Sequence, residues 1–364
     1  MDERIYQIGL SMLNGIGPLR AKSLVALLGS SEAVFRESDR NLSQLEGFGK
    51  KFVRELDRKS ALSRAESELE FIEKNNIQSY YYQDQGYSLR LKNAEDGPVV
   101  LYAMGALDFR PKSVAVVGTR SATSYGRKMT ELLIEGLAPH GVQIVSGLAH
   151  GIDKSAHEAA LSNGLQTIGV LGHGLDTMYP AAHRNLAKRM LQNGGLVTEF
   201  ASKTQGDPGN FPRRNRIVAG LSDAVVVIES SVKGGSMITA NLANDYDREC
   251  FAFPGPVDRE SSAGCNNLIK RNKAHLITSA EDLIEIMAWQ EQSKKNTHVQ
   301  AKIFAAMSPE EEKLVEILRD GGELDVDKLA HISKMMHGVL SFHLFNLEMN
   351  GLIRALPGKR YGLI

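Results

Sequence analysis

The chain has no excess of charge of either sign, since 43 Lys and Arg residues balance 43 Asp and Glu residues. A global positive field is therefore excluded, and any nucleic-acid site must be a local patch. Cysteine is scarce, with two residues, and no basic-then-apolar segment opens the chain. We therefore expect neither a disulfide framework nor secretion, and we expect a cytoplasmic protein. No apolar run approaches the roughly 18 residues that cross a bilayer, so we expect no membrane partner.

The length of the chain predicts more than one domain. Domains usually run to about 100–200 residues, so 364 residues correspond to two or three of them. Hydrophobic residues make up 42% of the chain and charged residues 24%, which is typical of folded globular proteins. We therefore expect a series of folded domains.

Residues 1–66 show two similar glycine turns between helical segments. The first is Gly15-Ile16-Gly17, and Gly47-Phe48-Gly49 follows 32 residues later. The repeat predicts a small helix-hairpin-helix or SAM-like domain, in which glycines let the amides at a helix start approach a DNA phosphate. A helical packing domain whose glycines only make turns explains the same pattern. Charge favours DNA binding only slightly, because the stretch holds 11 basic and 9 acidic residues.

Residues 67–289 are predicted to form an α/β domain with its core from residue 112. The stretch 67–105 is predicted to be a connector whose aromatic cluster, Tyr80-Tyr81-Tyr82, is more typical of core packing than of base stacking. Short β-branched runs then alternate with helical segments, which predicts a doubly wound parallel sheet with helices on both faces. The expected strands are 114–117, 143–145, 167–171, 195–199, 224–229, 249–253 and 275–277.

A polar stretch separates this domain from a C-terminal unit. Residues 290–305 are predicted to be a linker, and residues 306–364 predict three helices followed by a short hairpin. Three helices and a hairpin wing are typical of a winged helix. Because this unit holds 7 basic and 9 acidic residues, its charge favours a protein contact over a DNA contact.

Polar, glycine-rich turns follow the predicted strands at the edge where doubly wound sheets bind their ligands. Small residues leave backbone amides accessible there, and helix starts add positive dipole ends, so the turns predict an anion-binding floor for phosphates. Neither the G-x-G-x-x-G fingerprint of dinucleotide-binding proteins nor a P-loop lysine motif is present. The candidate DNA contacts from these turns are Arg120, Ser121, Ser146, Gly147, His150, Lys154, Lys233, Gly235 and Ser236.

The densest positive charge lies in Arg213-Arg214-Asn215-Arg216, close to Phe211. Guanidinium groups suit bidentate phosphate contacts and a phenyl ring suits base stacking, so these five residues complete the predicted DNA site. A solvated or salt-bridged helix start is the alternative explanation for the arginine run. The histidines raise a rival hypothesis of a metal site, but no H-E-x-x-H spacing is present. We therefore predict neither a metal nor another cofactor.

Several segments, taken in order, carry a resemblance to a known family. They are Val114–Arg120 with Tyr125-Gly126, Val145–Asp153 with Ala156-His157, Val170–Asp176 with Tyr179-Pro180, Phe211–Ser222, Gly235–Ala240 and Phe253-Pro254-Gly255. In this order they resemble the bacterial DNA-processing protein A family (DprA, also called Smf). The match spans the whole sheet domain, and an N-terminal helical unit with a C-terminal winged helix is also a family arrangement.

The resemblance implies an extended Rossmann fold whose positive pocket binds single-stranded DNA, usually in a homodimer. It also implies a nonenzymatic recombination mediator that helps load RecA onto incoming strands during natural transformation. Arg120 matches the family's pocket arginine, and the arginines of 213–216 match its basic signature. In two places the chain departs from the family, since His150 stands where many members have arginine and Tyr87-Ser88 where many have Tyr-Pro. Histidine at position 150 is expected to weaken a phosphate contact or make it pH dependent.

Two other functions stay open from the sequence. Gly234-Gly235-Ser236 resembles the glycine turn of nucleotide-binding and nucleotide-cleaving Rossmann enzymes of the lysine-decarboxylase-like type, which place a catalytic glutamate just after it. Met237–Asn241 follows here without a carboxylate, so we predict that the protein is not an enzyme. The other alternative is a scaffold that acts through the acidic winged helix. In that case, charge reversal at Arg213 or Arg214 leaves function intact.

Overall fold

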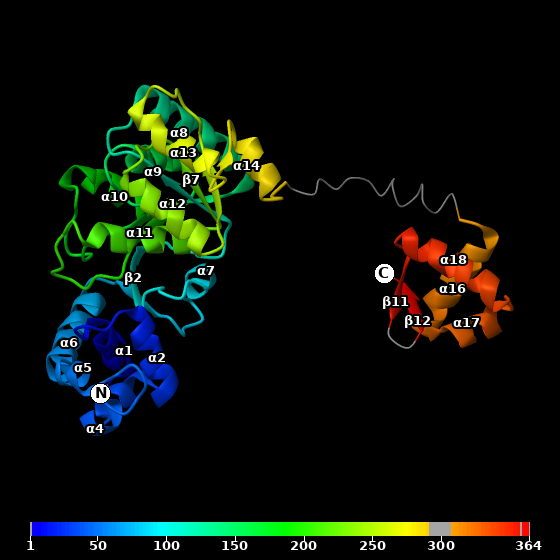
Figure 1. The fold of residues 1–364 in the computed structure, drawn as a ribbon, viewed down its shortest axis with the longest axis horizontal. Coiled ribbons are helices and arrows are strands. Elements are labelled where there is room, and N and C mark those ends of the chain that lie inside the picture. The colour runs from blue at the N-terminus through cyan, green and yellow to red at the C-terminus, as the bar shows by residue number, and fades with distance from the viewer. Residues whose placement is uncertain (1, 291–306, 357–358, 364) are drawn as a thin grey trace. The chain divides into compact units, whose positions relative to one another are not determined.

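The computed structural model of the protein describes residues 2–290, 307–356 and 359–363. It divides the chain into two units, Met1–Trp289 and Gln290–Ile364, which Figure 1 shows as ribbons. Apart from Gln290, the predicted linker 290–305 lies outside the described residues. Within the described ranges, no helix is both long and apolar enough to cross a membrane.

Helices make up the N-terminal part of the first unit. They are α1 (Glu3–Met12), α2 (Pro18–Leu28), α3 (Ser31–Arg36), α4 (Asp39–Leu42), α5 (Lys50–Arg54) and α6 (Arg58–Lys74). Both glycine turns lead into a helix, because Gly17 is the N-cap of α2 and Gly49 is the N-cap of α5. Residue 66, the predicted end of this domain, falls inside α6, and the division at that residue stays a prediction.

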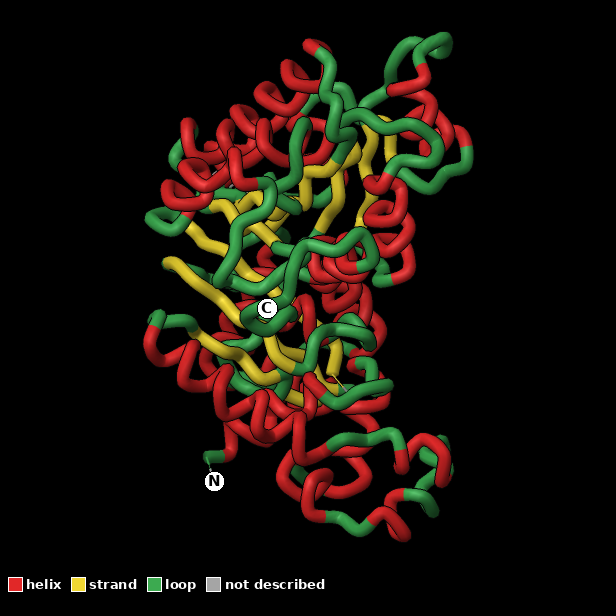
Figure 2. The backbone as a smooth tube through the Cα atoms, turned by 90° about the vertical axis from the view of Figure 1, so that its left-hand side faces the viewer, coloured by secondary structure: helices red, strands yellow, loops and turns green. Residues whose placement is uncertain are grey.

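A sheet forms the centre of this unit, as the yellow strands in Figure 2 show. Its strand order is β1-β2-β6-β5-β4-β3-β7-β8-β9. Its strands are β1 (Gln78–Tyr81), β2 (Val100–Gly105), β3 (Ser113–Val117), β4 (Gln143–Ser146), β5 (Thr167–Val170), β6 (Gly194–Thr198), β7 (Ala224–Val227), β8 (Glu249–Ala252) and β9 (His275–Leu276). Strands β3 to β9 pair in parallel. The predicted doubly wound sheet is thereby confirmed.

The prediction of a plain connector over 67–105 is wrong, because this stretch supplies two strands of the same sheet. β1 and β2 pair antiparallel, and β2 also pairs antiparallel with β6. The short helix α7 (Leu89–Lys92) lies between them in the chain. β1 contains no β-branched residue, so it lacks the signal that marked the other strands. Of the aromatic cluster, Tyr81 is buried in the core, and Tyr80 and Tyr82 are partly buried against it, which favours the prediction of core packing.

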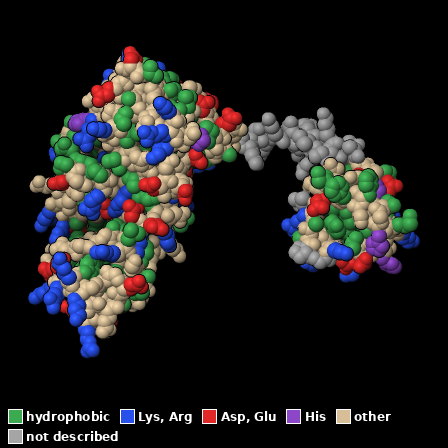
Figure 3. Space-filling model, viewed as in Figure 1, with side chains coloured by type: hydrophobic (Ala, Val, Ile, Leu, Met, Phe, Trp, Pro, Cys, Tyr) green, Lys and Arg blue, Asp and Glu red, His purple; other side chains and the backbone are tan. Residues whose placement is uncertain are grey.

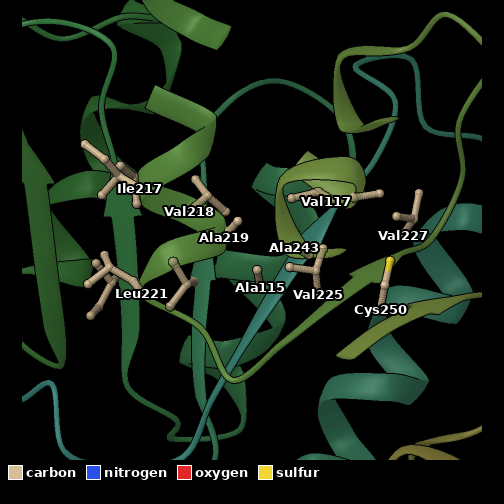
Figure 4. Packing of buried hydrophobic residues seen from close by; sticks show 14 of the residues in the cluster. Ala115, Val117, Ile217, Val218, Ala219, Leu221, Val225, Val227, Ala243 and Cys250 are labelled. Carbon is tan, nitrogen blue, oxygen red and sulfur yellow. The ribbon is translucent and has the colours of Figure 1, made fainter. Parts of the chain in front are cut away.

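Helices cover both faces of the sheet because its central strands are apolar on both sides. Ala115 and Val117 belong to one buried cluster, which includes residues of α11 (Asn210–Gly220) and α12 (Gly235–Asp245), as Figure 4 shows. Val114 and Val116 belong to a second cluster, with residues of α8 (Ser124–Leu137) and α9 (Ile152–Ser162). The remaining helices of this unit are η1 (Ala138–His140), η2 (Ala181–His183), α10 (Arg184–Met190), α13 (Glu260–Lys270) and α14 (Ala280–Ile286).

The N-terminal helices are fixed to the sheet by a shared core. Residues of α1, α2, α3 and α6 form one buried cluster with residues of β1 and β2. At this junction the hydroxyl oxygens of Ser31 and Tyr81 lie 2.9 Å apart in a buried hydrogen bond. Lys22 Nζ also donates to the carbonyl oxygen of Glu95 at 2.9 Å. The helical part and the sheet therefore form one body within the first unit.

The second unit has the architecture of a winged helix. Its described elements are α16 (Pro309–Gly321), β10 (Leu324–Asp325), α17 (Val326–Ser333), α18 (His337–Met349), β11 (Ile353–Leu356) and β12 (Arg360–Leu363). The strands form a small sheet in the order β10-β12-β11. Ser308 and Glu311 form a capping box at the start of α16, which satisfies amides that a helix start leaves unpaired. The predicted helices and hairpin are confirmed.

Candidate nucleic-acid interface

A small pocket opens where β3, β4 and β5 end, at the sheet edge where the sequence predicts a site. Segments far apart in the sequence meet there. The lining residues are Arg120, Gly147, Leu148, Ala149, His150, Leu171, Gly172, Tyr179, Pro180, Phe211 and Arg214. The fold therefore brings five of the predicted contact residues to one place: Arg120, Gly147, His150, Phe211 and Arg214.

Glu229, just after β7, holds the loop that carries Arg120. Its backbone oxygen accepts a hydrogen bond from the amide of Thr119 at 2.7 Å. Its carboxylate accepts from the amide and hydroxyl of Thr123 at 3.0 and 2.9 Å. Glu229 is only 2% exposed, so these bonds are shielded from water. Arg120 is exposed on a loop whose backbone is tied to the end of β7.

Arg120 and two aromatic rings form the accessible part of the pocket. The guanidinium carbon of Arg120 lies 5.2 Å from the centre of the Phe211 ring. The ring centres of Phe211 and Tyr179 are 5.8 Å apart. Gly172 leaves room for this arrangement, because a Cβ at that position would lie 3.0 Å from Cδ1 of Phe211. A cation beside aromatic rings can bind a phosphate and stack on a base.

Tyr179 is a site residue that is absent from the contacts predicted from the sequence. The sequence places it only in a family motif, yet its side chain is 51% exposed and lies beside Phe211. A large aromatic residue in a polar turn after a strand is the signal that could have identified it. We therefore add Tyr179 to the candidate site.

Arg214 lines the inner end of the pocket, where it links the turn after β4 to the end of β5 by hydrogen bonds. It is 5% exposed, and Nη1 donates to the carbonyl oxygens of Gly147 and Val170. Burial lowers the pKa of Arg214, and the nearby charge of Asp153 opposes that effect. Oδ2 of Asp153 accepts from the amides of Gly147 and Ala149 at 3.1 and 3.3 Å. The amides of Gly147 and Ala149 therefore bind the carboxylate of Asp153. From the sequence we expected amides of this turn to bind a DNA phosphate.

Three further predicted contacts are also buried and bonded inside the protein. Arg216 is 8% exposed, forms an ion pair with Glu199 and donates to the carbonyl oxygen of Asp96. The hydroxyl of Ser146 donates to Val116 at 2.6 Å, and the hydroxyl of Ser236 donates to Ser230 at 2.8 Å. Since these groups bind internal partners, we exclude them from the direct DNA contacts, together with Arg214 and with Gly147, whose amide and carbonyl oxygen are bonded to Asp153 and Arg214.

The other predicted contacts are exposed or half-buried around the strand ends. His150 is exposed, and its ring centre lies 4.8 Å from that of His183. Lys154 forms an exposed ion pair with Glu158 at 3.5 Å. Asn215 Nδ2 donates to the carbonyl oxygen of Gly235 at 3.3 Å, which links α11 to the start of α12. The remaining members of this group are exposed: Ser121, Arg213, Lys233 and Gly235.

The Tyr87-Ser88 departure lies in the core, away from the pocket. The hydroxyl of Tyr87 donates to the carbonyl oxygen of Pro98 at 2.7 Å. Ser88 is buried and caps α7 through its hydroxyl, which accepts from the amide of Leu91 at 3.4 Å. A side-chain cap of this kind is available to serine and unavailable to proline.

Two buried histidines of the sheet domain, His157 and His173, have internal partners. His157 Nδ1 lies 2.7 Å from the hydroxyl of Thr167, and burial lowers the pKa of His157 to about 3. His173 Nε2 accepts from the amide of Tyr179 at 3.1 Å. Among the residues that the structure describes, no three His, Cys, Asp or Glu side chains are grouped so that they could hold a metal ion.

The winged helix presents an apolar face on α18. Its exposed hydrophobic residues include Val339, Phe342, Phe345 and Met349, and hydrophobic side chains gather over this helix in Figure 3. The helix contains no Lys or Arg. Because phosphate binding needs local positive charge, this face is unsuited to a DNA backbone. The finding agrees with the protein-contact interpretation of the sequence.

Comparisons with known proteins match both units. The family model described as DNA recombination-mediator protein A matches residues 78–288, and the model described as DprA winged helix domain matches residues 300–359. Protein Smf of Synechocystis sp. is 32% identical over 393 residues, which covers 99% of this chain and 98% of that protein.

Two solved structures of proteins from other bacteria are also similar to this chain. DNA processing protein A from Streptococcus pneumoniae aligns with a TM-score of 0.64 and 32% identity, covering 78% of this chain and 98% of that one. DNA processing protein A from Helicobacter pylori, whose structure is described as revealing a single-stranded DNA binding mode, aligns with a TM-score of 0.53 and 31% identity. That alignment covers 58% of this chain and 95% of the other. The chain therefore belongs to the DNA recombination-mediator protein A family.

Proposed function

We propose that the pocket at the ends of β3, β4 and β5 binds single-stranded DNA. The observation that carries the proposal is the stack of Arg120, Phe211 and Tyr179. In a duplex the bases are already stacked on one another, whereas a single strand can place a base against exposed rings. Phosphates carry no sequence information, so we expect binding that tolerates many sequences. The single-stranded DNA binding mode described for the Helicobacter pylori protein supports the same ligand.

The proposed DNA contacts surround this stack. Phosphates would meet exposed cations, and bases would meet the rings of Phe211 and Tyr179. Besides Arg120, Phe211 and Tyr179, the proposed contacts are Ser121, His150, Lys154, Arg213, Asn215, Lys233 and Gly235. A continuous positive field is not needed, because a local group of cations releases the counterions of the phosphates that it contacts.

We infer that the protein acts as a recombination mediator by presenting the bound strand to RecA recombinase in the course of natural transformation. The family description as a recombination mediator supports this role. We also propose a homodimer, and the cytoplasm as its location. The reducing cytoplasm suits Cys250 and Cys265, which are both free and buried.

RecA loading is tested by timing filament assembly on a fluorescent single strand, with and without this protein. A mediator shortens the lag before RecA assembles, because it holds the strand in a form that RecA can enter. An unchanged lag at saturating protein would contradict the RecA step while leaving DNA binding intact. The Arg120→Glu variant is the matched control, since we expect it to lose the effect together with the DNA.

Replacing Tyr179 tests the role of the exposed ring. We expect Tyr179→Ala to weaken single-strand binding by about 1–3 kcal/mol, the usual loss when one stacking side chain is removed. Tyr179→Phe keeps the ring and should bind within about twofold of the wild type. Fluorescence anisotropy with a labelled oligonucleotide measures both variants. Equal losses in the two variants would assign the effect to the hydroxyl group and contradict stacking.

We propose a nonenzymatic role for this site. Asp153, Glu199 and Glu229 are acidic groups near the strand ends, and Glu199 is paired with Arg216. The carboxylates of Asp153 and Glu229 support the loops. Both are buried and accept hydrogen bonds from loop amides. Because their oxygens accept these hydrogen bonds, the two carboxylates stabilise the loops and are poorly placed to act as general bases. The residues after the glycine turn, Met237–Asn241, contain no carboxylate, which also disfavours the lysine-decarboxylase-like alternative.

A further inference from the structure

A second, larger groove lies next to the strand-end pocket within the first unit. It runs between the turn after α1, the loop after β6 and α6, at the junction of the N-terminal helices with the sheet in Figure 1. Its lining includes Asn14, Gly17, Arg64, Lys203, Asn210 and Arg213. Its volume is about 530 Å³, within the roughly 300–1,000 Å³ of an ordinary ligand pocket.

The first turn of α11 separates the groove from the pocket. Phe211 lines the pocket, while Asn210 and Arg213 line the groove. The guanidinium carbon of Arg213 lies 5.1 Å from the centre of the Phe200 ring on the groove side. A strand that stacks on Phe211 therefore reaches the groove within one turn of helix.

The charge of the groove suits a polyanion. Arg213 and Lys203 are exposed, and neither forms an ion pair with any residue that the structure describes. Glu199, the acidic residue among the described lining residues, is already paired with Arg216. Two free cations and one neutralised carboxylate leave the lining net positive, which favours phosphates.

The wall that carries Lys203 is held in place by buried polar contacts. The carboxylate of Glu68, which is 2% exposed, accepts from the amide and hydroxyl of Ser202 at 2.9 and 2.6 Å. Arg64 forms an ion pair with Glu68 at 3.0 Å and donates to the hydroxyl of Ser202 at 3.1 Å. The amide of Lys203 donates to Asp176 at 2.9 Å. These contacts set the position of the cation before any ligand arrives.

We propose that single-stranded DNA continues from the pocket across the first turn of α11 into this groove, where Lys203 and Arg213 contact the next phosphates. The inference rests on the proposed function of the pocket. It makes the junction with the N-terminal helices part of the DNA path. Short strands then occupy the pocket alone, and longer strands also occupy the groove.

The test compares two thymidine oligonucleotides, one of about 3 and one of about 20 nucleotides, a range that brackets the usual site sizes of about 4–16 nucleotides. Lys203→Glu in the full chain should raise the Kd of the long strand about three- to tenfold. It should also flatten the slope of log K against log salt by about 0.7 for the lost phosphate contact. The Kd of the short strand should stay within about twofold of the wild type. Lys270→Glu, an exposed substitution on α13, is the control for net charge.

The possible outcomes distinguish DNA binding in the groove from DNA binding in the pocket. If Lys203→Glu binds the long strand like the wild type while Arg120→Glu has lost it, the groove takes another ligand, such as a protein segment, and the inference fails. If Lys203→Glu weakens both strands equally, Lys203 belongs to the pocket and the continuation is also overturned. If the wild type binds neither strand, the proposed function fails together with the inference.

Discussion

Arg214→Met should destabilise the first unit by about 2–6 kcal/mol, because two buried carbonyl oxygens lose their donor at about 1–3 kcal/mol each. The carbonyl oxygens of Gly147 and Val170 are left without this donor, and the buried carboxylate of Asp153 loses a nearby positive charge. Methionine fills much of the volume but donates no hydrogen bond. The loss is a large share of the roughly 5–15 kcal/mol that stabilises a typical domain.

Urea unfolding followed by tryptophan fluorescence measures this loss. The chain has one tryptophan, Trp289, which lies in the first unit and is 9% exposed. Its emission therefore reports on the sheet domain. Arg213→Met is the matched control, because Arg213 is exposed and its contact with Phe200 is worth only about 0.5–1 kcal/mol. If Arg214→Met unfolds at the wild-type midpoint and loses only DNA affinity, Arg214 is a DNA contact and the structural role is wrong.

Arg120→Glu should weaken single-strand binding about ten- to a hundredfold at low salt. The substitution removes a charge-assisted contact with a phosphate and places a like charge in its position. The side chain is exposed and stands over Phe211, so stability should fall by no more than about 1 kcal/mol, the usual value of an exposed cation–π contact. Anisotropy titrations at about 50 and about 200 mM salt measure the affinity and its salt dependence.

The salt dependence of DNA binding by the Arg120→Glu variant tests independently whether Arg120 contacts a phosphate. Loss of one phosphate contact flattens the slope of log K against log salt by about 0.7 for a single strand. Lys270→Glu changes the net charge by the same amount at the last residue of α13, outside the proposed contacts, and should leave the slope unchanged. If the Arg120→Glu variant keeps the affinity and the salt slope of the wild type, Arg120 does not contact DNA and the proposed site is contradicted.

The sheet is predictable from the sequence to the extent that its strands are buried on both faces. Such strands show continuous apolar runs, and the runs 114–117 and 224–229 correspond to β3 and β7. β1 shows no such run, because its sequence is Gln-Ser-Tyr-Tyr. Its pairing with β2 and its packing against the N-terminal helices make it a strand, and neither partner is visible in a local pattern.

The candidate site is only partly predictable for a similar reason. Arg213 and Arg214 are adjacent in the sequence, but successive residues of a helix point about 100° apart. One of them therefore faces the solvent while the other faces the carbonyl oxygens of Gly147 and Val170. The sequence shows that the segment 213–216 is positively charged. It does not show that Arg214 donates to carbonyl groups of residues far away in the sequence. Tyr179 shows the converse, since only the fold places it beside Phe211.

The central claim is that the full chain prefers single-stranded DNA because its pocket binds phosphates and unstacked bases together. The most direct measurement is an anisotropy titration of the wild type with a labelled single strand and the duplex of the same length, at two salt concentrations. We predict tighter binding to the single strand and a Kd that rises steeply with salt. Equal affinity for both forms, or affinity that salt does not change, would contradict the claim.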